Sequence, residues 1–213
     1  MRPHVWYVAY GSNLARDRFC CYLLGGRPAG GAREYEGCRD RSGPRDAWSI
    51  EAPGGLLFAG RSMVWGGGMA FYDRAAAGTI ACRAYLVTAE QFADVAAQEM
   101  RRPPGGEFAV ELTGLLPDVE TIVTTGSGMY ETIVRLGDHH GAPMFTITHH
   151  EVANLSLASP SGRYLEWVAR GLREAHAWDD LRIATYLEAS PGVRGAWSSD
   201  ELTALARAAG PAG

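Results

Sequence analysis

Val5-Trp6-Tyr7-Val8-Ala9-Tyr10-Gly11-Ser12-Asn13-Leu14 is a run of strand-forming residues that stops at a glycine and two helix-capping residues. Val5 to Tyr10 is aromatic and β-branched without strict alternation, which predicts a strand buried on both faces. Gly11 lets the backbone turn, and Ser12 or Asn13 can cap a helix that begins directly afterwards. The free N–H groups at such a helix start suit a carboxylate or a phosphate, although ordinary strand-to-helix turns use the same residues.

Length and composition indicate one large domain. At 213 residues with 46% hydrophobic content, the chain is long enough for one domain and short for two. We expect a single domain over residues 1–197 and a short C-terminal helix and tail over 198–213. The formal charge is −4 and basic residues do not cluster, which argues against nucleic acid or an anionic membrane as a partner. No apolar run approaches about 20 residues and no signal-peptide pattern is present, so a cytoplasmic protein is expected.

The second informative stretch is a strand followed by a capped helix. Thr79 to Val87 reads as a strand, and Thr88-Ala89-Glu90-Gln91 after it is a capping box that opens a helix. The apolar residues of this helix recur at i, i+3 and i+4 and mark its buried face. They are Phe92, Val95 and Ala96.

Glu99 is the next residue on that apolar face, at i+7 from Phe92. Burial and the negative end of the helix dipole both disfavour its ionised form, a setting in which a glutamate can act as a general base. The alternative from spacing alone is that Arg102 pairs with Glu99 at a solvated helix end.

The other elements follow from periodicity and turn residues. Strands are expected at Leu56–Gly60, Met63–Tyr72, Glu107–Leu112, Glu120–Thr125, Glu131–Leu136 and Met144–Thr148. Helices are expected after Ser161, with Tyr164, Val168 and Leu172 on one face, at Trp178–Ala189, and after the capping box at Ser198. The glycine run 66–68 predicts a bulge or a close approach of another backbone or a ligand, or else a plain hairpin loop.

Neither the cysteines nor the histidines predict a metal site. His139-His140 and His149-His150 flank one predicted strand, but adjacent strand residues point to opposite faces, so each pair offers one ligand. No Cys, Asp or Glu completes a recognised ligand set. The cysteines contain no C-x-x-C pair and are expected to be free thiols. They are Cys20, Cys21, Cys38 and Cys82.

Four motifs in order resemble the γ-glutamylcyclotransferase-like family, which includes γ-glutamylamine cyclotransferases and AIG2-like proteins. Tyr10-Gly11-Ser12-Asn13-Leu14 after an N-terminal strand is similar to the family signature. Gln98-Glu99 resembles the position of its proton-accepting glutamate. Ser127-Gly128-Met129-Tyr130 and Pro160-Ser161-Gly162-Arg163-Tyr164 resemble two places where a tyrosine faces the pocket. The resemblance runs from Val5 to about Leu187, with an insertion at 101–126.

The resemblance implies an α+β fold in which the strands form a small closed mixed β-barrel flanked by helices. It also implies cyclotransfer on a γ-glutamyl amine or γ-glutamyl amino acid, which releases 5-oxoproline and the free amine. Glu99 is then the catalytic residue, and no cofactor, metal, nucleic acid or membrane is involved. The implied substrate-binding residues are Tyr10, Gly11, Ser12, Asn13, Leu14, Tyr130 and Tyr164.

Other functions and roles remain open at this point. An amide hydrolase on the same scaffold would use Glu99 to activate water, and a non-enzymatic AIG2-like binding module would need no catalysis. Tyr130 can be an ordinary core aromatic residue, and Tyr164 a hydrophobic anchor. Product analysis separates the two enzymes, since cyclotransfer yields 5-oxoproline and hydrolysis yields glutamate.

Overall fold

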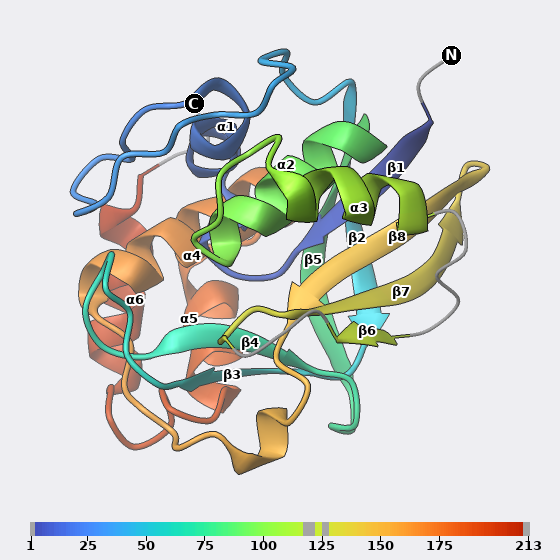
Figure 1. The fold of residues 1–213 in the computed structure, drawn as a ribbon. Helices are drawn as coiled ribbons and strands as arrows, with labels where there is room; N and C mark the ends of the chain where they lie inside the picture. Colours follow the sequence, from blue (N-terminus) through green and yellow to red (C-terminus); the bar gives the residue numbers. More distant parts are fainter. Residues whose placement is uncertain (1–2, 117–121, 125–127, 211–213) are drawn as a thin grey trace.

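The computed structural model describes residues 3–116, 122–124 and 128–210, which form a mixed α+β fold (Figure 1). A six-stranded mixed sheet has the strand order β2-β5-β1-β8-β7-β6, with β1 antiparallel to β5 and parallel to β8. Its strands are β1 His4–Ala9, β2 Asp46–Pro53, β5 Thr79–Thr88, β6 Ile122–Thr124, β7 Thr132–His139 and β8 Ala142–Thr148. A separate two-stranded ladder pairs β3 Gly55–Ala59 with β4 Met69–Asp73.

The described strands do not close into a barrel, so the closed barrel expected from the sequence is wrong. The chain leaves the sheet after β2 at Gly54, whose φ of 125° lies in the left-handed region, and β3 then pairs with β4 instead of continuing the sheet. The hairpin meets β8 through a side chain. The Thr148 hydroxyl accepts from the Tyr72 N–H at 3.2 Å and donates to the Tyr72 carbonyl at 2.8 Å. These bonds occupy the Tyr72 backbone groups that a closing ladder would use.

Strand β1 separates two hydrophobic cores. Trp6, Val8 and Tyr10 enter one core, and Val5 and Tyr7 enter the other, as the period of two in a strand requires. The prediction of a strand buried on both faces is confirmed. The first core is shared with α4 Gly162–His176, α5 Asp180–Ala189 and α6 Ser199–Ala208, and the second with α1 Arg16–Leu24, α2 Ala89–Glu99 and α3 Glu107–Leu115. Figure 1 shows α2 and α3 lying across the sheet.

Helix α3 and strand β2 differ from the prediction. The strand expected at Glu107–Leu112 is wrong, because these residues belong to helix α3, which begins after Gly106. Ala109 and Leu112 lie three residues apart and are both buried in the core shared with α2. Strand β2 was not predicted. It is an edge strand and largely exposed, so its sequence lacks a continuous apolar pattern.

The helix of the capping box is confirmed. The Thr88 hydroxyl accepts from the Gln91 N–H at 3.0 Å, and the Gln91 side chain accepts from the Thr88 N–H at 3.0 Å. This reciprocal cap fixes the start of α2. Among the helices in the described ranges, none combines the length and apolar character that crossing a bilayer requires.

Gly171 of α4 lets this helix approach the turn after β1. A Cβ at this position would overlap the backbone nitrogen of Ala15 and both the Cβ and the carbonyl carbon of Leu14. We predict that Gly171→Ala lowers the free energy of unfolding by about 1–3 kcal/mol, because the added methyl forces α4 away from the turn. Urea denaturation followed by circular dichroism measures this change.

The matched control is Gly114→Ala in α3, where an added Cβ meets no atom within 4 Å. This variant should be more stable by about 0.5–1 kcal/mol, the usual gain from replacing a helical glycine. Equal effects of the two substitutions would contradict the close packing of α4 on the turn.

Candidate functional site

The turn after β1 leads into one short 3-10 helix, η1 (Ser12–Leu14), before α1 begins at Arg16. The prediction that Ser12 or Asn13 caps a helix is wrong, since neither helix has a side-chain cap and Ala15 precedes α1. The Asn13 side chain is used elsewhere. Its Nδ2 donates to the Tyr7 hydroxyl at 2.9 Å and to Glu99 Oε1 at 3.3 Å.

Gly11 lies where the turn approaches two other elements. A Cβ at this position would lie 3.1 Å from both the Ala70 Cβ in β4 and the Tyr164 hydroxyl in α4. The Tyr164 hydroxyl in turn accepts from the Ala70 N–H at 3.3 Å. Glycine therefore allows β1, β4 and α4 to meet at one point.

Glu99 is the last residue of α2 and is partly buried. Its carboxylate accepts from the Asn13 amide. Burial raises the pKa of Tyr22, whose hydroxyl lies near enough that the charge of Glu99 raises it further. The alternative pairing with Arg102 is not the arrangement found, because the Arg102 guanidinium lies over the Phe108 ring, 4.5 Å from its centroid. Glu99 thus faces the turn after β1.

A pocket of about 400 Å³ lies between these elements. Every residue that the family resemblance assigned to the site lines it, with the exception of Leu14. The Leu14 side chain is fully buried in the core under α4. Six of the nine tyrosines of the chain line the pocket, which makes its wall both aromatic and rich in hydroxyls. They are Tyr7, Tyr10, Tyr22, Tyr35, Tyr130 and Tyr164.

The pocket hydroxyls stay protonated. Burial raises the pKa of Tyr7 and Tyr22, and the nearby charge of Glu99 raises both further. Burial likewise raises the pKa of Tyr130 and Tyr164. These groups can donate and accept hydrogen bonds at neutral pH but cannot act as bases, which leaves proton removal to a carboxylate such as Glu99.

Tyr130 contributes to the pocket wall beside β4. Its hydroxyl donates to the Ala70 carbonyl at 2.7 Å, and its ring stacks on Phe71 with centroids 4.9 Å apart. Ala70 is thus held by Tyr164 through its N–H and by Tyr130 through its carbonyl. Ser127, which belongs to the same motif, lies outside the described residues.

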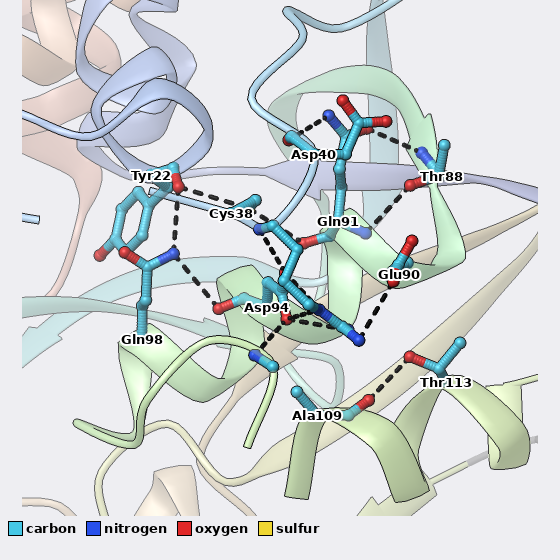
Figure 2. Close-up of polar contacts among 12 residues, drawn as sticks. Tyr22, Cys38, Asp40, Thr88, Glu90, Gln91, Asp94, Gln98, Ala109 and Thr113 are labelled. Carbon is cyan, nitrogen blue, oxygen red and sulfur yellow. Dashed lines mark hydrogen bonds and ion pairs between the residues drawn. The ribbon is translucent and has the colours of Figure 1, made fainter. Parts of the chain in front are cut away.

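A buried carboxylate fixes the helix that carries Glu99 (Figure 2). Asp94 of α2 is fully buried and accepts from the Arg39 N–H at 2.9 Å, from Arg39 Nη2 at 3.0 Å and from the Gly105 N–H at 2.8 Å. One turn later, Gln98 Nε2 donates to the Tyr22 carbonyl at 3.0 Å. These bonds tie α2 to α1 and to the segments that flank both helices, so Glu99 sits on a rigid support.

The glycine run forms a close approach to another backbone, one of the predicted alternatives. Gly67 and Gly68 lie against the backbone of residues 158–161, where a Cβ would collide. The strand predicted from Met63 begins only at Met69, since residues 63–66 turn around Ser62, whose hydroxyl accepts from the Trp65 N–H at 3.0 Å. The Trp65 ring then stacks on Tyr164 over the pocket, with centroids 6.2 Å apart.

The histidine pairs pack with one another and with aromatic rings. His139 and His140 lie against Trp48, and the rings of His149 and His150 stack with centroids 4.6 Å apart. Over the described ranges, no three His, Cys, Asp or Glu side chains are grouped so that they could hold a metal ion.

Sequence reasoning missed Arg18 as a pocket residue. Arg18 lies four residues before Tyr22 and next to Phe19, on the face of α1 that packs into the core. The signal was available in this spacing, because an arginine on an apolar helix face indicates a buried cation.

The comparisons with known proteins give a distant match in sequence. No protein-family model matches the chain. Histone deacetylase 5 of Arabidopsis thaliana is 30% identical over 200 residues, which cover 86% of this chain and 30% of that protein. The chain therefore spans less than a third of this relative, whose name describes the whole protein.

Solved structures resemble the chain more completely. The uncharacterized protein loc79017 from Homo sapiens is 14% identical with a TM-score of 0.51, and the match covers 96% of this chain and 98% of that one. A structure named gamma-glutamyl cyclotransferase is 14% identical with a TM-score of 0.48 over 96% and 99% of the two chains. YkqA from Bacillus subtilis is 16% identical with a TM-score of 0.36 over 80% and 48%. The likeness to the human structure, at 14% identity and a TM-score of 0.51, shows a shared fold and nothing beyond the fold.

Proposed function

We propose that the protein is a γ-glutamylcyclotransferase that acts on a γ-glutamyl amine or a γ-glutamyl amino acid. The observation that carries this proposal is the hydrogen bond of 3.3 Å between Asn13 Nδ2 and Glu99 Oε1. It brings together two motifs that lie 86 residues apart, at the wall of a pocket that Tyr130 and Tyr164 also line.

The reaction is an intramolecular acyl transfer. Glu99 takes a proton from the α-ammonium of the substrate, and the free amine attacks the γ-amide carbonyl carbon. A new C–N bond closes the five-membered ring as the original amide C–N bond breaks. The attacking nitrogen loses a second proton as the ring forms, and Glu99 relays both protons to the departing nitrogen, so the products are 5-oxoproline and the free amine in its ammonium form. No water is consumed.

The pocket supports this reaction mainly by positioning. Holding the amine nitrogen and the carbonyl carbon within about 3–3.5 Å supplies much of the rate acceleration of an intramolecular reaction. Gly11, Ser12 and Asn13 line the pocket, and the N–H groups at the start of a helical turn have no partner within that turn. We assign them to the oxygen that becomes negative when the carbonyl carbon is attacked.

The leaving amine lies on the side of Met100 and Arg101, which line the pocket after Glu99. This is where the insertion at 101–126 begins. Within it, the described residues include α3, packed on α2 in the same core as Tyr7, and the short strand β6. We propose that this segment selects the amine, while the γ-glutamyl half is recognised by the turn after β1 and by Glu99.

Glu99→Gln should lower 5-oxoproline release by at least about a hundredfold, because the amide keeps the shape of the side chain but cannot accept the proton. The variant should remain folded, since Glu99 is partly exposed at a helix end. The measurement is chromatographic quantification of 5-oxoproline, with circular dichroism in parallel.

The matched control is Glu166→Gln, an exposed glutamate on α4 that does not line the pocket. It should retain wild-type turnover. If Glu99→Gln retained activity within tenfold of the wild type, Glu99 would not be the proton acceptor.

Acetylation of the substrate's α-amine should abolish turnover, because the blocked nitrogen is no longer a nucleophile. A γ-glutamyl amino acid and its Nα-acetyl derivative are compared by release of the free amino acid. Release from the acetylated compound, with N-acetylglutamate as the second product, would assign the pocket to amide hydrolysis instead.

A further inference from the structure

Arg18 is a buried cation at the wall of the pocket. Its side chain projects from α1 and the residue is only 3% exposed. Nη2 donates to the Tyr35 hydroxyl at 2.7 Å and to the Tyr22 hydroxyl at 3.3 Å. The guanidinium carbon lies 4.6 Å from the Tyr35 ring centroid, 4.7 Å from that of Tyr22 and 5.7 Å from that of Trp65. Three aromatic side chains therefore surround the charge.

The charge of Arg18 has no anionic partner in the described part of the chain. No carboxylate there forms an ion pair with it, and its Nε and Nη1 are buried without a hydrogen-bond partner. Burial lowers the pKa of Arg18, but Tyr22, Tyr35 and Glu99 together outweigh this effect and raise it. The guanidinium remains charged. An uncompensated buried charge is costly, whereas an anion placed against it restores the balance.

Glu99 lines the same pocket as Arg18 and Tyr22. The Tyr22 hydroxyl accepts from Arg18 Nη2 at 3.3 Å, and burial and the nearby charge of Glu99 raise its pKa, so a cation and an anion both lie near this oxygen atom. An α-amino-acid head group carries an ammonium and a carboxylate on a single carbon. Its two charges are opposite to those of Arg18 and Glu99, so its carboxylate can pair with the guanidinium and its ammonium with Glu99 in the pocket that both side chains line.

We propose that Arg18 and Glu99 form a clamp for an α-amino-acid head group, in which Arg18 binds the α-carboxylate and Glu99 binds the α-ammonium. This inference rests on the proposed function, where the same ammonium provides the nucleophile. With the α-carboxylate held by Arg18, the backbone N–H groups of the turn after β1 are left for the γ-carbonyl oxygen. The ligand class is therefore a γ-substituted glutamyl compound with both α-groups free.

The other pocket arginines are less suited to this role. Arg33 donates through Nη1 to the Gln98 carbonyl at 3.1 Å and stacks on Tyr35. Arg61 and Arg101 are exposed at the rim of the pocket, where water screens their charge. Arg18 alone among these four is both deeply buried and hydrogen-bonded to the Tyr22 hydroxyl, whose pKa burial and the nearby charge of Glu99 raise.

The test is a comparison of ligand affinities by isothermal titration calorimetry. L-glutamine carries both α-groups and a γ-amide, L-glutaminamide replaces the α-carboxylate by an amide, and Nα-acetyl-L-glutamine blocks the ammonium. For the wild type, each change should weaken binding by about tenfold or more, because each removes a charge-assisted contact with a buried group. Equal affinity of L-glutamine and L-glutaminamide, or no binding of L-glutamine, would overturn the clamp without any substitution.

Substitutions of Arg18 test whether this residue binds the α-carboxylate of the ligand. In Arg18→Met, the preference for L-glutamine over L-glutaminamide should shrink to within about twofold, whereas the loss on Nα-acetylation should persist. Arg18→Lys, which keeps the charge, should retain part of the preference. Arg16→Met removes an exposed arginine of the same helix and should behave as the wild type.

A folded Arg18→Met variant with the full preference would overturn the clamp. Release of 5-oxoproline from a γ-glutamyl amino acid is measured on the same samples. Turnover without a carboxylate preference refutes the clamp and leaves the proposed function intact. A carboxylate preference that depends on Arg18, without 5-oxoproline release, supports the clamp as an amino-acid site and refutes the cyclotransferase.

Discussion

Burial of β1 on both faces is the constraint on which the arrangement of the site depends. Its alternate side chains, such as Trp6 and Tyr7, must enter two different cores, so helices cover both sides of the strand. The chain leaves β1 between these two layers. Residues 11–13 therefore emerge next to α2 from one layer and α4 from the other, and the pocket forms where the three meet.

The pocket combines the partly buried Glu99 carboxylate and the buried Glu131 carboxylate with the buried Arg18 guanidinium and a wall of neutral hydroxyls. Because burial keeps the tyrosines protonated, Glu99 and Arg18 are the groups whose charges act at short range on the Tyr22 hydroxyl. The low dielectric of such a wall strengthens these interactions. Asp94, on the same helix as Glu99, forms an ion pair with Arg39. It therefore helps to hold α2 in place but does not line the pocket.

The sequence predicted those features that depend on local patterns. The buried strand β1, the capping box at Thr88 and the position of Glu99 on an apolar helix face all follow from residues close in the chain. It failed where distant contacts decide the outcome. Barrel closure depends on which sheet edge the β3–β4 hairpin pairs with. The Asn13 side chain donates to Glu99, which is distant in sequence, and does not cap a helix. Arg18 is a different case, because its place on the apolar face of α1, four residues before Tyr22, was a local signal that went unused since most arginines are exposed.

The central claim is that the turn after β1 and Glu99 form one site for intramolecular acyl transfer. Turnover of a γ-glutamyl amino acid in water enriched in oxygen-18, followed by mass spectrometry of the acyl product, tests it most directly. Cyclotransfer predicts 5-oxoproline that carries no oxygen-18, because the α-amine of the substrate, and not water, attacks the carbonyl. Glutamate carrying one oxygen-18 atom would show that water is the nucleophile and would contradict the account.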